Sequence, residues 1–296
     1  MKIVHKLGEL LREGLNQAGD YNYVTSKVIG TSIPLVVHQS YFSKDLPEAI
    51  QANIDALKLA NPLWQFRLYD DADIEQYIQT HYPDLFTIYQ KINVKYGAAR
   101  VDFFRYLLIY NEGGVYLDIK SSLSKPLNEI IEANDQYLLS HWPNSAGQAY
   151  ENSGIYVDLP SPLGEFQQWH IIAVKGHPFL KSVIENVCNN IINYNPFIHH
   201  TGQTGVFRVT GPVAYTLAIM PHVNQFNHRL VRSHHELNLI YSIFSDNKDY
   251  KHRLLFKNHY STLSEPVTNM PYFSRLLFKI YQPIKDRLIL ILKKLR

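Results

Sequence analysis

The chain has 296 residues, a mass of 34.4 kDa and a formal net charge of +3. This length fits one large domain or two closely packed ones, because single hydrophobic cores stop growing at about 250–300 residues. With 46% hydrophobic and 19% charged residues, the composition excludes a disordered or collagen-like chain. The single cysteine, Cys188, excludes a disulfide framework and a zinc site built on cysteine pairs, and it favours a reducing compartment. The small net charge does not suggest a nucleic-acid partner.

The first segment, residues 1–30, is expected to form a helical extension. Leu7, Leu10, Leu11 and Leu15 recur at helical spacing among charged residues. Residues 1–22 contain no continuous apolar stretch, so an amphipathic helix is favoured over a signal peptide. A secreted protein is therefore not expected.

Residues 31–270 are expected to form one domain in which strands alternate with helices. Strands are expected at residues 33–38, 64–69, 114–118, 137–141, 154–157, 169–174, 240–244 and 253–256. Helices are expected at residues 47–60, 72–80, 83–89, 98–112, 178–193 and 212–220. This alternation predicts an α/β fold with a mostly parallel sheet.

Residues 98–120 bring three charged side chains together. Asp102 and Arg105 are three positions apart on one helix, which is also the spacing of an ordinary surface ion pair. Gly113 is expected to end this helix, and the strand that follows ends at Asp118. Ligands of open α/β sheets bind beyond the carboxyl ends of the strands, so these groups are candidates for a binding crevice. A carboxylate beside a guanidinium suits sugar hydroxyls, which both donate and accept hydrogen bonds.

Several other catalytic patterns are missing from the sequence. The fourteen histidines include adjacent pairs at 199–200 and 234–235 but no His-Glu-x-x-His motif, which argues against a zinc hydrolase. There is no Gly-x-Ser-x-Gly motif, no phosphate-binding loop and no Gly-x-Gly-x-x-Gly after the first strand. The sequence therefore gives little support for an acyl hydrolase, a P-loop enzyme or a Rossmann dinucleotide enzyme.

Four ordered motifs resemble those of glycosyltransferase family 32, the sugar transferases with a DXD motif. They lie at residues 33–41, 61–71, 99–106 and 113–118. The resemblance covers about residues 32–130 of a family that includes yeast-type α-1,6-mannosyltransferases and bacterial capsule enzymes. It implies a GT-A-type, Rossmann-like nucleotide-sugar-binding domain with added helices. It also implies a UDP- or GDP-hexose donor and transfer with retention of the anomeric configuration.

The resemblance also implies the roles of individual residues. Tyr41 stands where the family usually has a tryptophan that stacks on the nucleobase, and Asp118 matches the first acid of the DXD motif. The donor-binding residues implied in this way are Tyr41, Arg100, Asp102, Arg105, Tyr116 and Asp118. The expected catalytic residues are Asp118, Lys120 and Arg105.

Lys120 departs from the family motif, which requires a second aspartate at this position as a ligand of Mn²⁺ or Mg²⁺. Two hypotheses follow. In the first, the Lys120 ammonium stabilises the departing diphosphate, so that metal dependence is weakened or absent. In the second, Lys120 points away, and Asp118 with His259 still binds a divalent cation. The first hypothesis is favoured.

Residues 271–296 form a basic amphipathic C-terminal tail in sequence. From residue 273 onward, seven Lys and Arg side chains stand against Asp286 alone, and Pro283 divides the apolar residues between them. Such a segment suits the anionic surface of a membrane, although its longest apolar run is too short to cross a bilayer. A helix that packs on its own domain is the alternative.

These observations predict a retaining glycosyltransferase that moves a hexose from a nucleotide sugar to a saccharide acceptor, which the tail suggests is lipid-linked. The expected setting is bacterial surface polysaccharide or capsule synthesis, in the cytoplasm, peripheral to the inner face of the cell membrane. No nucleic-acid partner is expected. The alternatives are a catalytically inactive sugar-nucleotide or glycan-binding protein and a membrane-tethered interaction module.

Overall fold

The structure is a computed structural model that describes residues 22–244 and 260–270, together with Phe278 and Ile280. The predicted helix within residues 1–21, the predicted strand at 253–256, His259 and nearly all of the basic tail lie outside the described residues. The division into three segments stays a prediction.

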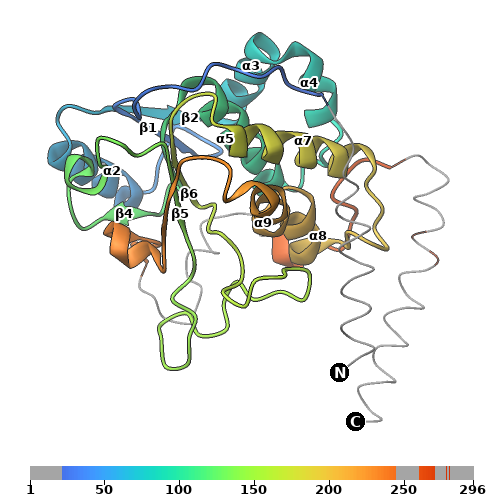
Figure 1. Cartoon of the computed structure of the whole chain (residues 1–296). Coiled ribbons are helices and arrows are strands. Elements are labelled where there is room, and N and C mark those ends of the chain that lie inside the picture. The colour runs from blue at the N-terminus through green and yellow to red at the C-terminus, as the bar shows by residue number, and fades with distance from the viewer. Residues whose placement is uncertain (1–21, 245–259, 271–277, 279, 281–296) are drawn as a thin grey trace.

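The described residues form a six-stranded sheet in the order β2-β1-β3-β6-β5-β7 (Figure 1). Its strands are β1 (Val36–Ser40), β2 (Gln65–Tyr69), β3 (Gly114–Leu117), β5 (Tyr137–Ser140), β6 (His170–Ala173) and β7 (Arg229–Val231). β1 is parallel to β2 and β3, and β5 is parallel to β7, whereas β6 is antiparallel to both of its neighbours. Two short strands, β4 (Ser122–Leu123) and β8 (Leu239–Ile240), form a separate antiparallel pair. The α/β class is confirmed, and this mostly parallel sheet fits the expected GT-A-type domain.

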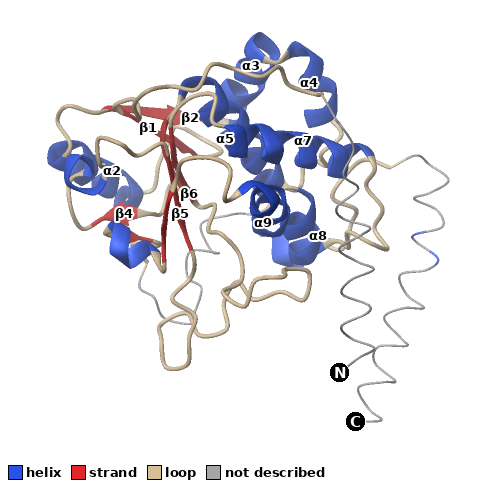
Figure 2. Cartoon of the chain, viewed as in Figure 1, coloured by secondary structure: helices blue, strands red, loops and turns tan. Residues whose placement is uncertain are grey.

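Helices cover both faces of this sheet (Figure 2). They are α2 (Glu48–Ala60), α3 (Asp71–His81), α4 (Pro83–Tyr89), α5 (Gly97–Glu112), α6 (Leu127–Ile130), α7 (Pro178–Ile192), α8 (Gly202–Val209) and α9 (Pro212–Ile219). As expected, α4, α7 and α9 begin at a proline, which suits the first helical turn because its missing N–H would have no partner there. Asp70 caps α3, since its side chain accepts from the Asp73 backbone N–H at 2.9 Å.

Alternation along the strands divides the hydrophobic core into two layers. On β3, Tyr116 belongs to the larger layer, which is formed with α3, α4, α5, α7, α8 and α9. Val115 and Leu117 belong to the opposite layer, where they pack with Leu127 and Leu237. Because successive side chains of a strand point to opposite faces, this one strand contributes to both layers.

Helix α5 is buried on more sides than its apolar spacing predicts. Asp102 and Arg105 are buried along with Phe104 and Leu108, whereas Val101 is only half-buried and lines a cavity. The reason is that α5 packs against β3, α3, α7 and α8, so it has little solvent-exposed surface. The helix ends at Gly113, whose φ of +72° favours glycine.

The second half of the chain departs most from the sequence-based expectations. The strand predicted at residues 154–157 is wrong, because residues 141–169 form one long loop between β5 and β6 (Figure 2). Gly154 lies in a turn of this loop with a φ of +72°. The strand predicted at 240–244 is reduced to Leu239–Ile240 in β8, and α8 and β7 were not predicted.

Candidate active site

A cavity of about 440 Å³ lies at the carboxyl ends of β1 and β3. Tyr41 follows β1 directly and Asp118 follows β3 directly, and both line the cavity. Asp102 and Arg105 line it from α5. Because β1 and β3 are parallel neighbours, their carboxyl ends meet at one edge of the sheet, where open α/β sheets bind ligands.

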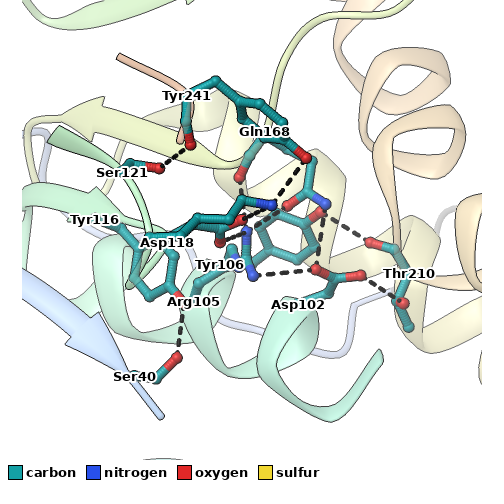
Figure 3. A network of polar contacts seen from close by, with 11 residues as sticks. Ser40, Asp102, Arg105, Tyr106, Tyr116, Asp118, Ser121, Gln168, Thr210 and Tyr241 are labelled. Atoms are coloured by element: carbon teal, nitrogen blue, oxygen red, sulfur yellow. Dashed lines mark hydrogen bonds and ion pairs between the residues drawn. The ribbon is translucent and has the colours of Figure 1, made fainter. Parts of the chain in front are cut away.

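Asp102 is the most deeply buried acid of this site, with only 3% of its surface exposed. One carboxylate oxygen accepts a hydrogen bond from Gln168 Nε2 at 3.2 Å, and the other accepts from Thr210 Oγ1 at 3.0 Å (Figure 3). Burial raises the pKa of Asp102 to about 6, while the neighbouring Arg105 and these two hydrogen bonds act against the rise. The carboxylate is therefore held in one orientation by residues distant in sequence.

Arg105 joins the two acids of the site (Figure 3). One terminal nitrogen lies 3.1 Å from Asp118 Oδ1 and donates to the backbone and side-chain oxygens of Gln168, each at 2.9 Å. The other terminal nitrogen lies 3.4 Å from Asp102, and the guanidinium stacks 4.5 Å from the centre of the Tyr116 ring. Burial alone would lower the pKa of Arg105, but Tyr116 and the two carboxylates raise it, so the guanidinium stays charged.

Tyr116 and Tyr41 bring aromatic rings to the same cavity. The Tyr116 hydroxyl lies 2.7 Å from Ser40 Oγ, and burial raises its pKa to about 12, which keeps it neutral near pH 7. The Tyr41 ring is tilted against Phe42, with 4.3 Å between ring centres. Tyr41 therefore lies beside the sheet edge expected to hold the donor.

Arg100 is the one predicted donor-binding residue that does not line the cavity. Its guanidinium donates to Tyr89 Oη at 2.9 Å and lies 2.5 Å from Glu75 on α3. Arg100 precedes Asp102 by two positions, about 200° around the helix, so the two side chains leave α5 on opposite sides.

Lys120 lies at the cavity, close to the acid that precedes it by two positions. Its ammonium donates to Tyr241 Oη at 2.8 Å, lies 4.1 Å from the centre of that ring and is 4.0 Å from Asp118 Oδ2. The Asp118 backbone N–H donates to the Trp169 carbonyl at 2.8 Å, which fixes the start of this turn. Asp118 thus has a cation on each side, Arg105 and Lys120.

The described residues of this cavity do not by themselves fit a divalent cation. Within residues 22–244 and 260–270, no group of three His, Cys, Asp or Glu side chains could hold a metal ion. Arg105 and Lys120 would both repel a cation bound to Asp118. His259, the other predicted ligand, lies outside the described residues, so its role stays a prediction.

The sequence did not identify four residues that line the cavity or hold its charged groups in place. Gln168 and Thr210 position Asp102, and Trp142 and Glu165 line the cavity from the long loop. Thr210 stands at the Thr-Gly-Pro entry of α9, which marks a helix start but gives no sign of a contact with α5. No local signal in the sequence distinguishes Gln168 or Glu165.

Comparison with known proteins matches residues 47–137 to the model of the glycosyltransferase sugar-binding region containing DXD motif. Inositol phosphoceramide mannosyltransferase 3 of Schizosaccharomyces pombe is 27% identical over 187 residues, which is 62% of this chain and 46% of that protein. The initiation-specific alpha-1,6-mannosyltransferase of Candida albicans is 27% identical over 55% of this chain and 45% of that protein. The chain spans about half the length of the curated relatives it matches. Among solved structures, the PaToxG glycosyltransferase is similar with a TM-score of 0.47 and 16% identity, over 75% of this chain and 79% of that one.

Proposed function

Since residues 47–137 match the glycosyltransferase sugar-binding region containing DXD motif and the relatives are named as mannosyltransferases, we propose that the chain transfers a hexose from a nucleotide sugar to a saccharide acceptor with retention of configuration. The observation that carries this proposal is the convergence of Asp102, Arg105 and Asp118 on one cavity at the carboxyl edge of the sheet. The names of the relatives favour mannose as the hexose.

The acids and the guanidinium suit the donor sugar. Asp102 can accept hydrogen bonds from sugar hydroxyls, and Arg105 can donate to sugar oxygens, so a ring with several hydroxyls meets both kinds of partner. Both groups are already held in place by Gln168 and Thr210. A site whose groups are ordered before the donor arrives spends less free energy on binding it.

The proposal puts the diphosphate of the donor next to Lys120. Its ammonium and the Arg105 guanidinium lie on either side of Asp118 and supply positive charge where the leaving diphosphate gains negative charge. This supports the first of the two hypotheses for Lys120, in which transfer has a weakened or absent requirement for Mn²⁺ or Mg²⁺.

The proposed chemistry needs no dedicated protein base. The bond between the sugar C1 and the diphosphate oxygen breaks, and the acceptor oxygen forms a new bond to C1 on the same face. The acceptor proton passes to the leaving diphosphate, so atoms and charge balance. The protein holds the acceptor oxygen close to the sugar C1 and stabilises the negative charge that develops on the leaving diphosphate.

The acceptor is proposed to be a lipid-linked saccharide of bacterial surface polysaccharide synthesis, such as a capsule, reached at the inner face of the cell membrane. The basic tail supports this placement, and some relatives are named as inositol phosphoceramide mannosyltransferases. No helix among the described residues is long and apolar enough to cross a bilayer. A variant shortened at about residue 270 should lose co-sedimentation with vesicles rich in phosphatidylglycerol, and full retention of binding would contradict the role of the tail.

Substitution of Asp118 tests the proposed activity against the alternative of a sugar-nucleotide or glycan-binding protein. Sugar transfer is measured by mass spectrometry with UDP- and GDP-hexoses and a panel of methyl glycosides as acceptors. Asp118→Asn should lower the transfer rate at least about a hundredfold, whereas Asp45→Asn, at an exposed acid, should not change it. Donor binding by the wild-type protein without any product would support the alternative.

A further inference from the structure

Three aromatic side chains that contact one another form part of the cavity wall. Trp142, Trp169 and Tyr241 all line the cavity, and their rings pack edge to face. The Trp142 and Tyr241 rings are 4.9 Å apart at 85°, and those of Trp169 and Tyr241 are 5.4 Å apart at 65°. Behind them, His234 packs against both tryptophans, and burial lowers its pKa to about 3, so this support is uncharged.

One carboxylate, that of Glu165, stands in this aromatic wall. Glu165 lines the cavity but is only 5% exposed, and its Oε1 accepts a hydrogen bond from Trp142 Nε1 at 2.6 Å. The other oxygen, Oε2, is buried and makes no hydrogen bond of normal geometry with a described residue. Burial raises the pKa of Glu165 to about 7, while hydrogen bonding from Trp142 and the interaction with the Tyr156 hydroxyl, which does not reach the geometry of a normal hydrogen bond to Oε2, act against the rise. A buried carboxylate oxygen without a donor is costly, which suggests a ligand that supplies one.

The loop is shaped closely around this carboxylate. A side chain at Gly154 would come 2.5 Å from Trp142 Cδ1 and 2.9 Å from Glu165 Cγ, so only glycine fits there. The Glu165 backbone N–H donates to the Gly154 carbonyl at 2.9 Å, and that of Phe166 donates to Thr216 Oγ1 at 2.8 Å. Glu165 is therefore fixed on both sides, although it lies in a loop without regular structure.

A continuous series of contacts links Glu165 to the proposed donor side. Glu165 bonds to Trp142, which packs on Tyr241, whose hydroxyl accepts from Lys120 beside Asp118. A group held at Glu165 would thus share one cavity with a donor sugar bound beside Asp102 and Arg105. Aromatic faces suit the apolar face of a pyranose, and a carboxylate accepts from its hydroxyls.

We propose that Glu165 and the aromatic wall of Trp142, Trp169 and Tyr241 form the subsite for the acceptor sugar. A pyranose ring packs against the aromatic side chains and donates a hydroxyl hydrogen bond to Glu165 Oε2. This inference rests on the proposed function and names the part of the cavity that the acceptor occupies. Glu165 positions the acceptor and takes no part in breaking the donor bond.

Kinetics of Glu165→Gln test this assignment, because the amide keeps the size of the side chain and can still accept from Trp142. The Michaelis constant for the acceptor should rise about tenfold, since the hydrogen bond that Glu165 Oε2 accepts from the sugar hydroxyl is lost. Nucleotide release from the donor without acceptor should stay within about twofold of wild type. The matched control is Glu129→Gln, at an exposed position on α6, which should change neither quantity.

Two kinetic outcomes would overturn the assignment. An unchanged Michaelis constant for the acceptor would show that Glu165 does not contact it. An equal loss of acceptor-free nucleotide release would place Glu165 in donor chemistry or in the fold.

A binding measurement separates this inference from the proposed function if the wild-type protein turns over no donor. Two of the three tryptophans of the chain, Trp142 and Trp169, line the cavity, so their fluorescence should change when a sugar binds. Titration with methyl glycosides of mannose, glucose, galactose and N-acetylglucosamine should give a saturable change that Glu165→Gln and Trp142→Phe weaken. No change with any of these glycosides would overturn the subsite whether or not the protein is a transferase.

Discussion

The two sides of the cavity are built in different ways. The proposed donor side, called the donor side below, stands on regular structure, with Asp102 and Arg105 on α5 and Asp118 directly after β3, and its charged groups contact one another. The opposite side stands largely on the loop of residues 141–169 and is aromatic, with Glu165 as its carboxylate.

The difference indicates a division of tasks. On the donor side, opposite charges lie 3.1–3.4 Å apart, and their attraction offsets part of the cost of burying them. A site of fixed charged groups suits a nucleotide diphosphate, which is always highly charged. On the aromatic side, one carboxylate oxygen is left without a good hydrogen bond among the described residues, which suits a neutral ligand with a hydroxyl.

The largest effect is expected from Arg105→Ala, which breaks the donor side. The change leaves two carboxylates facing each other in a buried site without their shared cation. The free energy of unfolding should fall by about 3–5 kcal/mol, as for other broken buried ion pairs, and transfer should be undetectable. Urea unfolding followed by circular dichroism measures the first quantity, and product analysis measures the second.

Arg232→Ala is the matched control, because this arginine is exposed. It should unfold at the urea concentration of the wild type. An Arg105→Ala protein that is as stable as this control would show that the two acids do not depend on the guanidinium.

A smaller change in stability, which depends on pH, is expected when Glu165 on the aromatic side is substituted. Folding raises the pKa of Glu165 from 4.5 to about 7, so the folded protein binds this proton more tightly than the unfolded chain. Ionisation of Glu165 therefore costs stability, and the cost grows as pH rises from about 4.5 to 7. Glu165→Gln should gain stability relative to the wild type over this range, on the order of 2 kcal/mol. Unfolding curves at pH 4.5, 6 and 8 test the sign, and a stability difference that is the same at each pH would contradict it.

The smallest effect is expected from Ser40→Ala, which sharpens the description of the donor side. It removes the 2.7 Å hydrogen bond to the buried Tyr116 hydroxyl, which should cost about 1–2 kcal/mol of stability. The Michaelis constant for the donor should rise only a few-fold, because Tyr116 still packs against Arg105. Ser145→Ala, in the exposed part of the loop, serves as the control. A loss of all activity in Ser40→Ala would indicate that the Tyr116 hydroxyl contacts the donor directly.

The donor side could be predicted from the sequence because its signals are local. Asp102 and Arg105 are three residues apart on one helix, and Gly113 ends that helix just before the strand that leads to Asp118. This local pattern predicts that the three charged groups lie close together. The burial of this pair could not be predicted, since it depends on the packing of other helices against α5.

The partners of that pair are remote in sequence. Gln168 and Thr210 lie 66 and 108 positions from Asp102, and the Thr-Gly-Pro sequence at Thr210 indicates a helix start but no contact with α5. Glu165 was missed for the same reason, since its burial results from a long loop whose course no periodic pattern indicates. Residues 154–157, which were incorrectly predicted to form a strand, belong to the same loop.

The central claim is sugar transfer in which Lys120 supplies positive charge to the leaving diphosphate without a requirement for a metal ion. It is tested most directly by nucleotide release from UDP- and GDP-hexoses, in Mn²⁺ and in EDTA, with the wild type, Lys120→Ala and the exposed control Lys91→Ala. We expect the wild type and the control to release nucleotide from one donor at similar rates in both media. The Lys120→Ala protein should be slower by about 10²–10³-fold. Release that requires Mn²⁺, or an unaffected Lys120→Ala protein, would contradict the role of Lys120, and no release from any donor with sugar acceptors present would contradict the proposed transfer.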